Sequence, residues 1–160
     1  AIVHVGGVAR LSDLVGASVK DAQVLEAVFS CLHNLAGSPD CWWDAREHQL
    51  VFWTFQALGK HRRDIVLQKT GYFLLWNLAI TPEMAHDIVE ENGVEKVIGT
   101  FETLRDAPDA LVPAIGLLRN LFAPGNNRRA AMVRFVDQGG SKHIMELLWR
   151  QSLPQDEHKS

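Results

Sequence analysis

Three asparagines stand at one fixed interval along this chain of 160 residues. Asn34, Asn77 and Asn120 are each 43 residues apart, and each precedes a leucine at the end of an apolar stretch. A carboxamide carries a hydrogen-bond donor and an acceptor together. The chemistry that these positions offer is therefore polar binding.

Residue types that carry catalysis or bind metals show no comparable spacing. The sequence has no phosphate-binding glycine loop, no HExxH and no CxxC motif. Its seven histidines are scattered and show no ligand spacing with Cys31 and Cys41. Cys31 is expected on an apolar helical face, where a thiol is inert, and Cys41 in a turn. The sequence therefore argues against an enzyme and predicts no cofactor and no metal.

Two large aromatic side chains accompany the middle asparagine. On a helical wheel Phe73 and Trp76 share with Asn77 the face opposite the apolar one. Exposed aromatic rings beside a polar group are typical of a binding hot spot, although Trp76 could instead pack into a seam between neighbouring helices. The equivalent faces supply a polar, mildly basic rim suited to an acidic segment: Lys69, His33, Arg119 and Ser30.

Two further clusters leave their roles open. The run GKHRRD at 59–64 lies at a predicted turn between helices, and is either a solvated loop or a site for phosphate or an acidic partner. The run CWWD at 41–44 places Trp42 and Trp43 in a short helix, where we expect both in the core.

Amphipathic helices must position the asparagines. The stretch DAQVLEAVFSCLHNLA at 21–36 has period 3.6, and the pattern returns 43 and 86 residues later. Asp21, Asp64 and Asp109 are predicted to start these three helices. The predicted inward positions are Val24, Val28, Cys31, Leu32 and Leu35; Leu67, Gly71, Leu74, Leu75 and Leu78; and Ala110, Ala114, Leu117, Leu118 and Leu121.

Two other helices precede each of these. A short one is predicted after Ser38-Pro39 and after Thr81-Pro82, where a hydroxyl residue precedes proline at the first helical position. A second one follows a glycine at Gly7 and Gly93, and again at 139–140, three residues late. The middle copy lacks this glycine, so 44–59 is predicted to run on as one bent helix.

The fold class that follows is all-α, with one three-helix unit repeated in a single domain 1–160. The units are approximately 1–37, 38–80, 81–123 and 124–152, with the first and last incomplete and a polar tail at 153–160. A unit of this size buries its apolar face only by stacking on its neighbours. The alternative is an unrelated helical bundle in which the interval is a coincidence.

Composition sets limits on the partners. The chain is 47% hydrophobic and 22% charged with a net charge of -3, which gives no general attraction to nucleic acid or to a membrane surface. No basic leader with a cleavage site opens the sequence. Two cysteines make no disulfide framework, so we expect a reduced intracellular compartment, the cytoplasm in particular.

The repeated text resembles the armadillo repeat family. The entry Gly-Gly-Val at 6–8, Asn-Gly-Val at 92–94 and Gly-Gly at 139–140 matches the start of that family's second helix. The strings CLHNLA, LLWNLA and LLRNLF match the end of its third helix. The resemblance covers almost the whole chain and implies a right-handed α-solenoid, with HEAT repeats as the structural runner-up.

The same resemblance implies a role for the asparagines. In armadillo proteins that bind extended peptides, the equivalent residues hydrogen-bond the peptide backbone in a concave groove. Asn34, Asn77 and Asn120 would form such a ladder, or each would merely tie its own helix end to a neighbouring loop. Importin-type arrays carry tryptophan four residues before the asparagine. Here those positions are a serine, Phe73 and Gly116, which argues against a receptor for nuclear-localisation signals.

Two functional hypotheses follow. The first is a protein-interaction module that holds a protein or peptide segment in its groove. The second is a structural or oligomerisation domain that acts through its open ends, as expected for a fragment of a longer protein or an array that meets another chain. Family analogy alone adds a regulator of a small GTPase and a substrate receptor of a ubiquitin ligase.

Overall fold

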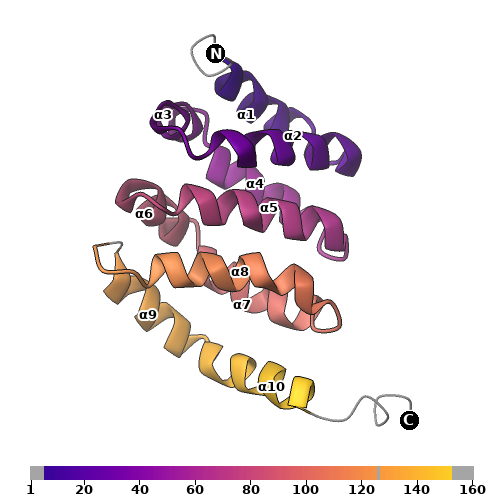
Figure 1. Ribbon diagram of the computed structural model, residues 1–160, viewed down its shortest axis with the longest axis vertical. Coiled ribbons are helices and arrows are strands. Elements are labelled where there is room, and N and C mark those ends of the chain that lie inside the picture. The colour runs from indigo at the N-terminus through magenta and orange to yellow at the C-terminus, as the bar shows by residue number, and fades with distance from the viewer. Residues whose placement is uncertain (1–5, 126, 153–160) are drawn as a thin grey trace.

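The computed structural model describes residues 6–125 and 127–152, and every regular element in these ranges is an α-helix. The all-α prediction is therefore confirmed. Figure 1 shows the helices stacked along the long axis, with α1 and α10 at opposite ends of the stack. The described helices are α1 Gly7–Ala17, α2 Ala22–Leu35, α3 Pro39–Glu47, α4 Leu50–Lys60, α5 Ile65–Leu78, α6 Pro82–Glu90, α7 Gly93–Thr103, α8 Pro108–Leu121, α9 Arg128–Asp137 and α10 Gly140–Ser152.

Helix lengths repeat from unit to unit. The short first helices α3 and α6 have 9 residues each, the second helices α4 and α7 have 11, and the third helices α5 and α8 have 14. Helices α1 and α2 match the second and third, with 11 and 14 residues. The third helices α2, α5 and α8 form one layer in which α5 lies between the other two (Figure 1).

Aspartate caps set the start of two third helices. The Asp21 carboxylate accepts a hydrogen bond from Val24 N at 3.1 Å, and the Asp64 carboxylate accepts one from Leu67 N at 3.0 Å. Each bond satisfies one of the free N–H groups of a first turn. The same prediction for Asp109 is wrong. Helix α8 begins at Pro108, and Asp109 lies inside its first turn without being the cap.

A left-handed residue separates the first and second helices. Gly6, Gln49 and Asn92 precede α1, α4 and α7 with φ of 71°, 52° and 57°. The prediction of one bent helix over 44–59 is therefore wrong, because α3 ends at Glu47 and α4 begins afresh at Leu50. Glutamine takes up a backbone conformation that glycine adopts without strain. The last such residue, Gly139, has φ of 70° and follows a longer interval.

The core is continuous along the stack. The predicted inward residues of α5 and α8 are all buried, as are Val28 and Leu32 of α2. Because helices of successive units contribute to one cluster, burial of apolar surface holds the units together. Within the described ranges, no helix combines the length and the apolarity that crossing a bilayer demands.

Three predictions about single residues near α3 are wrong. Cys31 is an exposed free thiol rather than a core residue. Trp43 is 72% exposed, whereas Trp42 is half-buried and donates from Nε1 to Ala36 O at 2.7 Å. Cys41 lies within α3, not in a turn, and its burial raises the pKa of the thiol to about 11. The polar tail at 153–160 lies outside the described residues.

Candidate functional site

Two of the three asparagines bridge neighbouring third helices. Asn77 Nδ2 lies 3.0 Å from His33 Nδ1 and 3.3 Å from His33 O, across the α2–α5 seam. Asn120 Nδ2 donates to Trp76 O at 3.1 Å, across the α5–α8 seam. Because an amide nitrogen only donates, the imidazole Nδ1 of His33 acts as the acceptor. Each bridge spans 44 residues, so the asparagine interval serves first to join the units.

The first asparagine makes a different bond. Asn34 is exposed, and its Nδ2 donates to Ser30 O at 3.0 Å within its own helix. Ser30 in turn donates from Oγ to Glu26 O at 2.9 Å. Both side chains therefore lie on the surface of α2 and leave acceptor atoms open to solvent. Among the described residues, no hydrogen bond reaches the carboxamide oxygen of Asn77 either.

The aromatic side chains of α5 lie across both seams. The Phe73 ring meets the His33 ring edge-on, with centroids 5.6 Å apart. It stacks on Trp76 at 5.9 Å. Trp76 then covers Gly116 of α8, where an added Cβ would lie 2.6 Å from the indole. The glycine is needed because the ring takes the space of a side chain. Trp76 is thus a seam residue that stays half-exposed on the same face.

The exposed side of the third helices, which we call the third-helix face, is apolar with unpaired cations. Its predicted members on the rim are Lys69 and Arg119, both exposed and without an ion pair in the described part of the chain. Around them lie half-exposed rings and aliphatic side chains with 52% to 57% of their surface accessible. These aliphatic residues are Val66, Ile80 and Val112.

The basic turn after α4 contains one residue that is hydrogen-bonded to the preceding unit and three cations that are exposed to solvent. His61 Nε2 lies 3.0 Å from Val19 O, so this histidine ties the turn to the preceding unit. Lys60, Arg62 and Arg63 are exposed, and no ion pair to them is found in residues 6–125 and 127–152. Arg62 donates from Nε to Gly59 O at 3.2 Å. The turn therefore presents three cations to solvent beside the end of α4.

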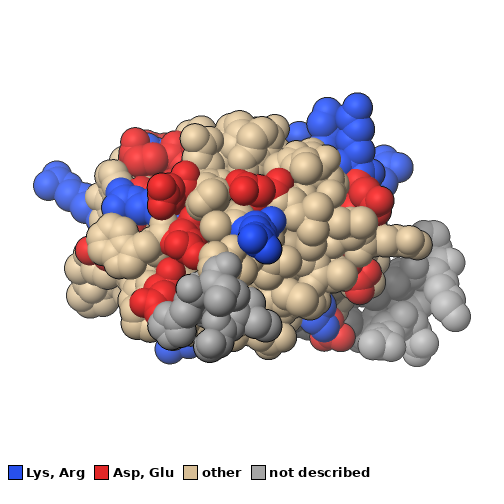
Figure 2. Space-filling model, turned by 90° about the horizontal axis from the view of Figure 1, so that it is seen from above, with Lys and Arg blue, Asp and Glu red and all other residues tan. Residues whose placement is uncertain are grey.

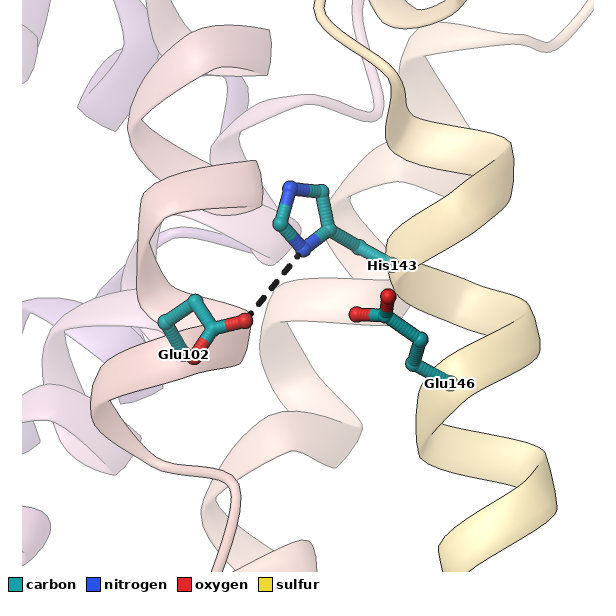
Figure 3. A group of neighbouring side chains, drawn as sticks. All are labelled: Glu102, His143 and Glu146. Carbon is teal, nitrogen blue, oxygen red and sulfur yellow. Dashed lines mark ion pairs between the residues drawn. The ribbon is translucent and has the colours of Figure 1, made fainter.

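A histidine and two glutamates come together near the C-terminal end of the stack. Figure 3 shows Glu102 of α7 facing His143 and Glu146 of α10, with His143 Nδ1 3.7 Å from Glu102 Oε1. The candidate ligand atoms lie within 4.8 Å of one another. Positive charge already compensates this group, because Lys142 Nζ is 3.8 Å from Glu146 Oε1 and two arginines line the same hollow. We interpret the cluster as an ion-pair network that joins α7 to α10.

Charge is mixed at the other end of the stack. Figure 2 looks onto the N-terminal end and shows acidic and basic side chains interspersed with uncharged surface. One ion pair of this region joins His48 Nδ1 to Asp13 Oδ1 at 2.7 Å. Since neither sign dominates the view, charge alone gives this end no preference for a polyanion.

Some residues of the third-helix face cannot be recognised from their residue type alone. Val66 is an ordinary apolar residue on a helix, and its exposure of 52% is visible only in three dimensions. The signal that could have found it is the interval, because the residues 43 positions before and after are Gln23 and Asp109. Apolar side chains where equivalent helices carry polar ones indicate a surface that is not simply solvated.

Comparisons of the chain with models of protein families, with curated proteins and with solved structures found no match. The resemblance to armadillo repeats therefore stays a hypothesis drawn from the sequence. The geometry of the third-helix face supplies the support for a functional assignment.

Proposed function

We propose that this chain is a non-catalytic protein-interaction module that binds a segment of a partner protein along the third-helix face. In the armadillo-type, right-handed solenoid that the sequence resembles, this face is the concave side of the array. The bound segment is extended, carries apolar side chains and is acidic on balance.

The proposal rests on one feature: an exposed apolar and aromatic strip that carries two cations without ion pairs. Phe73 and Trp76 supply large ring surfaces at low conformational cost, which is typical of binding hot spots. Lys69 lies one helical turn before Phe73 on α5, and Arg119 lies on the adjacent helix α8 at the position equivalent to Trp76. Both cations would attract carboxylates. The asparagine bridges hold the three helices in register, so little ordering is needed on binding.

The test uses peptides selected from a random display library on the immobilised wild-type chain. Their affinities are then measured for the double variant Lys69→Glu/Arg119→Glu and for Phe73→Ser, which installs the side chain of the equivalent Ser30. We expect each variant to weaken binding at least about ten-fold, through charge repulsion or loss of the ring. Circular dichroism should show unchanged helicity for the charge variant.

The matched control is Arg10→Glu/Arg129→Glu, which changes the net charge equally at two exposed cations on α1 and α9. Affinities should stay within about two-fold of wild type, because these side chains lie off the face. Selected peptides whose affinity is unchanged in both face variants would contradict the proposal.

A second candidate function is assembly through the C-terminal end of the stack. The last two helices expose large apolar side chains, each between 41% and 69% accessible: Met132, Val133, Val136, Met145, Leu148 and Trp149. Surfaces of this kind are buried in interfaces between chains or units. If assembly is the function, wild type should sediment as an oligomer at micromolar concentration and Met145→Glu/Leu148→Glu as a monomer. A monomeric wild-type chain would rule this candidate out.

A further inference from the structure

A groove separates the second helices α4 and α7 on the side away from the third-helix face. Its cavity volume is about 340 Å³, within the range of roughly 300 to 1,000 Å³ that is typical of ligand sites. Phe55 and Leu58 of α4 and the Tyr72 ring of α5 supply its apolar lining. Helices α4 and α7 are less closely packed than α1 and α4, the equivalent pair one unit earlier.

Comparison of these two helix pairs shows why the groove is open. In the α1–α4 pair, the Trp53 indole covers Gly16, where an added Cβ would lie 3.1 Å from the ring. The equivalent positions 43 residues later are Lys96 and Gly59. The Lys96 ammonium lies 4.3 Å from the Phe55 ring centroid and also donates to Glu91 O. Lysine thus leaves Gly59 uncovered, with no atom within 4 Å of an added Cβ.

A second glycine widens the groove from the opposite wall. Gly99 lies in the middle of α7, and a Cβ added there would also meet no atom within 4 Å. Its φ is not in the left-handed region, so neither backbone conformation nor close packing requires glycine. Glycine inside a helix is destabilising relative to alanine. Folding alone therefore gives no reason for Gly99, whereas an open groove does.

The mouth of the groove is basic. Arg62 lines it, and Lys60 and Arg63 flank Arg62 on the same turn, all three without ion pairs in the described ranges. Glu95 is the only acidic residue of the lining; Arg134 Nη1 lies 3.9 Å from its Oε1, and its buried Oε2 has no hydrogen-bond partner among the described residues. The apolar interior is complementary to an apolar side chain of a peptide, and the unpaired cations are complementary to acidic residues on either side of that side chain.

We infer that the α4–α7 groove is a second binding site, which takes an acidic peptide segment and inserts one of its aliphatic or aromatic side chains between Gly59 and Gly99. The carboxylates of the segment meet the cations of the turn. This site is separate from the third-helix face, because Tyr72 reaches the groove from one side of α5 whereas Phe73 and Trp76 project from another.

The test is a titration of the isotope-labelled full chain with a pool of short synthetic peptides, followed by nuclear magnetic resonance. Each peptide has a central leucine, phenylalanine or tryptophan between runs of aspartate, and a matched pool has asparagine in place of aspartate. We expect saturable shifts of the Gly59 and Gly99 amide signals with the acidic pool, and binding at least about ten-fold weaker with the asparagine pool.

The decisive variant is Lys96→Trp, which reproduces at Gly59 the packing of Trp53 on Gly16. It should keep or raise the thermal midpoint and abolish the shifts, because the indole fills the groove. Gly99→Leu provides a second way to fill the same space, since no atom lies within 4 Å. The control is Gln56→Trp, at an exposed residue of α4 that does not line the groove.

In the third-helix variant Lys69→Glu/Arg119→Glu, the acidic pool should still shift the Gly59 and Gly99 amide signals as it does in wild type, because both substitutions lie outside the groove. The behaviour of this variant therefore distinguishes failure of this site from failure of the proposed function. The inference is overturned if the acidic pool produces no saturable shifts. It is equally overturned if the asparagine pool binds as tightly, or if folded Lys96→Trp and Gly99→Leu retain binding.

Discussion

At the scale of single residues, two helical glycines lie in opposite surroundings, one tightly packed and one open. Gly116 is required because the Trp76 indole occupies the place of its side chain, with ring atoms 2.6 Å from an added Cβ. Gly99 faces open space in an equally regular helix. Apart from proline, glycine has the lowest helix propensity. Replacing it by alanine therefore stabilises the helix unless the added methyl group clashes with a neighbour.

Replacing each of these glycines by alanine should shift stability in opposite directions. Gly99→Ala should raise the free energy of unfolding by about 0.5 to 1 kcal/mol, because the helix gains and nothing clashes. Gly116→Ala should lower it by about 1 to 3 kcal/mol, because the indole must move. Urea denaturation measures both. Stabilisation by both changes would show that the Trp76 seam is not tightly packed, and destabilisation by both would show that Gly99 does not face open space.

The buried phenol of Tyr72 links stability to alkaline pH. Its burial raises the pKa to about 12 from 10.0, while a hydrogen bond with Thr100 Oγ1 at 2.6 Å acts in the opposite direction. The unfolded chain therefore loses this proton first. The stabilising effect is fully present below pH 10 and is lost as pH rises toward 12.

We expect the free energy of unfolding to fall by up to about 1.4 kcal/mol per pH unit in this window from this group alone. The variant Tyr72→Phe should lack this contribution to the pH dependence of the free energy of unfolding. Because the chain has a single tyrosine, tyrosinate absorbance during the titration reports on this residue only. Equal slopes for the wild type and the variant would contradict the assignment.

At the scale of elements, the residue before each second helix fixes the bend from the first. Gly6, Gln49 and Asn92 all adopt the left-handed conformation at the same place in successive units. The three residue types differ in what this costs. Glycine adopts it freely, asparagine tolerates it, and a glutamine side chain makes it strained.

Gln49→Gly should therefore stabilise the chain by up to about 1 kcal/mol, although glycine normally destabilises structured segments. Asn92→Gly should change stability by only a few tenths of a kcal/mol, roughly, and serves as the matched control. Thermal unfolding of the three proteins in one buffer measures the difference. Destabilisation by Gln49→Gly would show that the bend is held by side-chain contacts of the glutamine instead.

The sequence predicts the elements well where periodicity carries the signal. The interval of the asparagines correctly gives three equivalent helices, and the Asp21 and Asp64 caps form as expected. The break at Gln49 is missed because glutamine is not a turn-forming residue. Its only signal is its place 43 residues after Gly6. Trp43 is misplaced because a hydrophobic residue in a short helix does not reveal which side faces the core.

The candidate sites are harder to predict than the helices. The sequence leaves open whether the asparagines face a partner or tie parts of the fold together, and it does not reveal that Asn77 and Asn120 donate to neighbouring third helices. The groove between α4 and α7 depends on side chains that are absent, at Gly59 and Gly99. A search for reactive or charged residue types cannot reveal an empty space. Comparison of positions 43 residues apart in successive units can reveal it.

At the scale of the whole molecule, stability depends on coupling between neighbouring units. Core residues form one cluster from α1 to α9, and the asparagine bridges add directional bonds between α2, α5 and α8. In such an array each unit supports only its neighbours, so loss of one bridge should act locally. Asn34 lacks a bridge of this kind and makes its bond within α2.

Asn77→Ala should lower the free energy of unfolding by about 1 to 3 kcal/mol, because it leaves the His33 acceptors without their donor. Asn34→Ala should be nearly neutral, since its bond lies on an exposed helix surface. Hydrogen exchange should show the loss of protection concentrated in α2 and α5. Equal effects of both changes, or a loss spread evenly over α2 to α8, would contradict coupling through the bridges.

The α2–α5 and α5–α8 seams are filled by side chains of different size at equivalent positions. His33 meets Phe73 in the first seam, while the equivalent pair in the second is Trp76 over the bare backbone of Gly116. Duplicating the central unit would force an indole against a phenyl ring, and deleting it would leave an imidazole above a void. Complementary volumes thus encode the order of the units, and the modules of this chain cannot be shuffled without repacking their junctions.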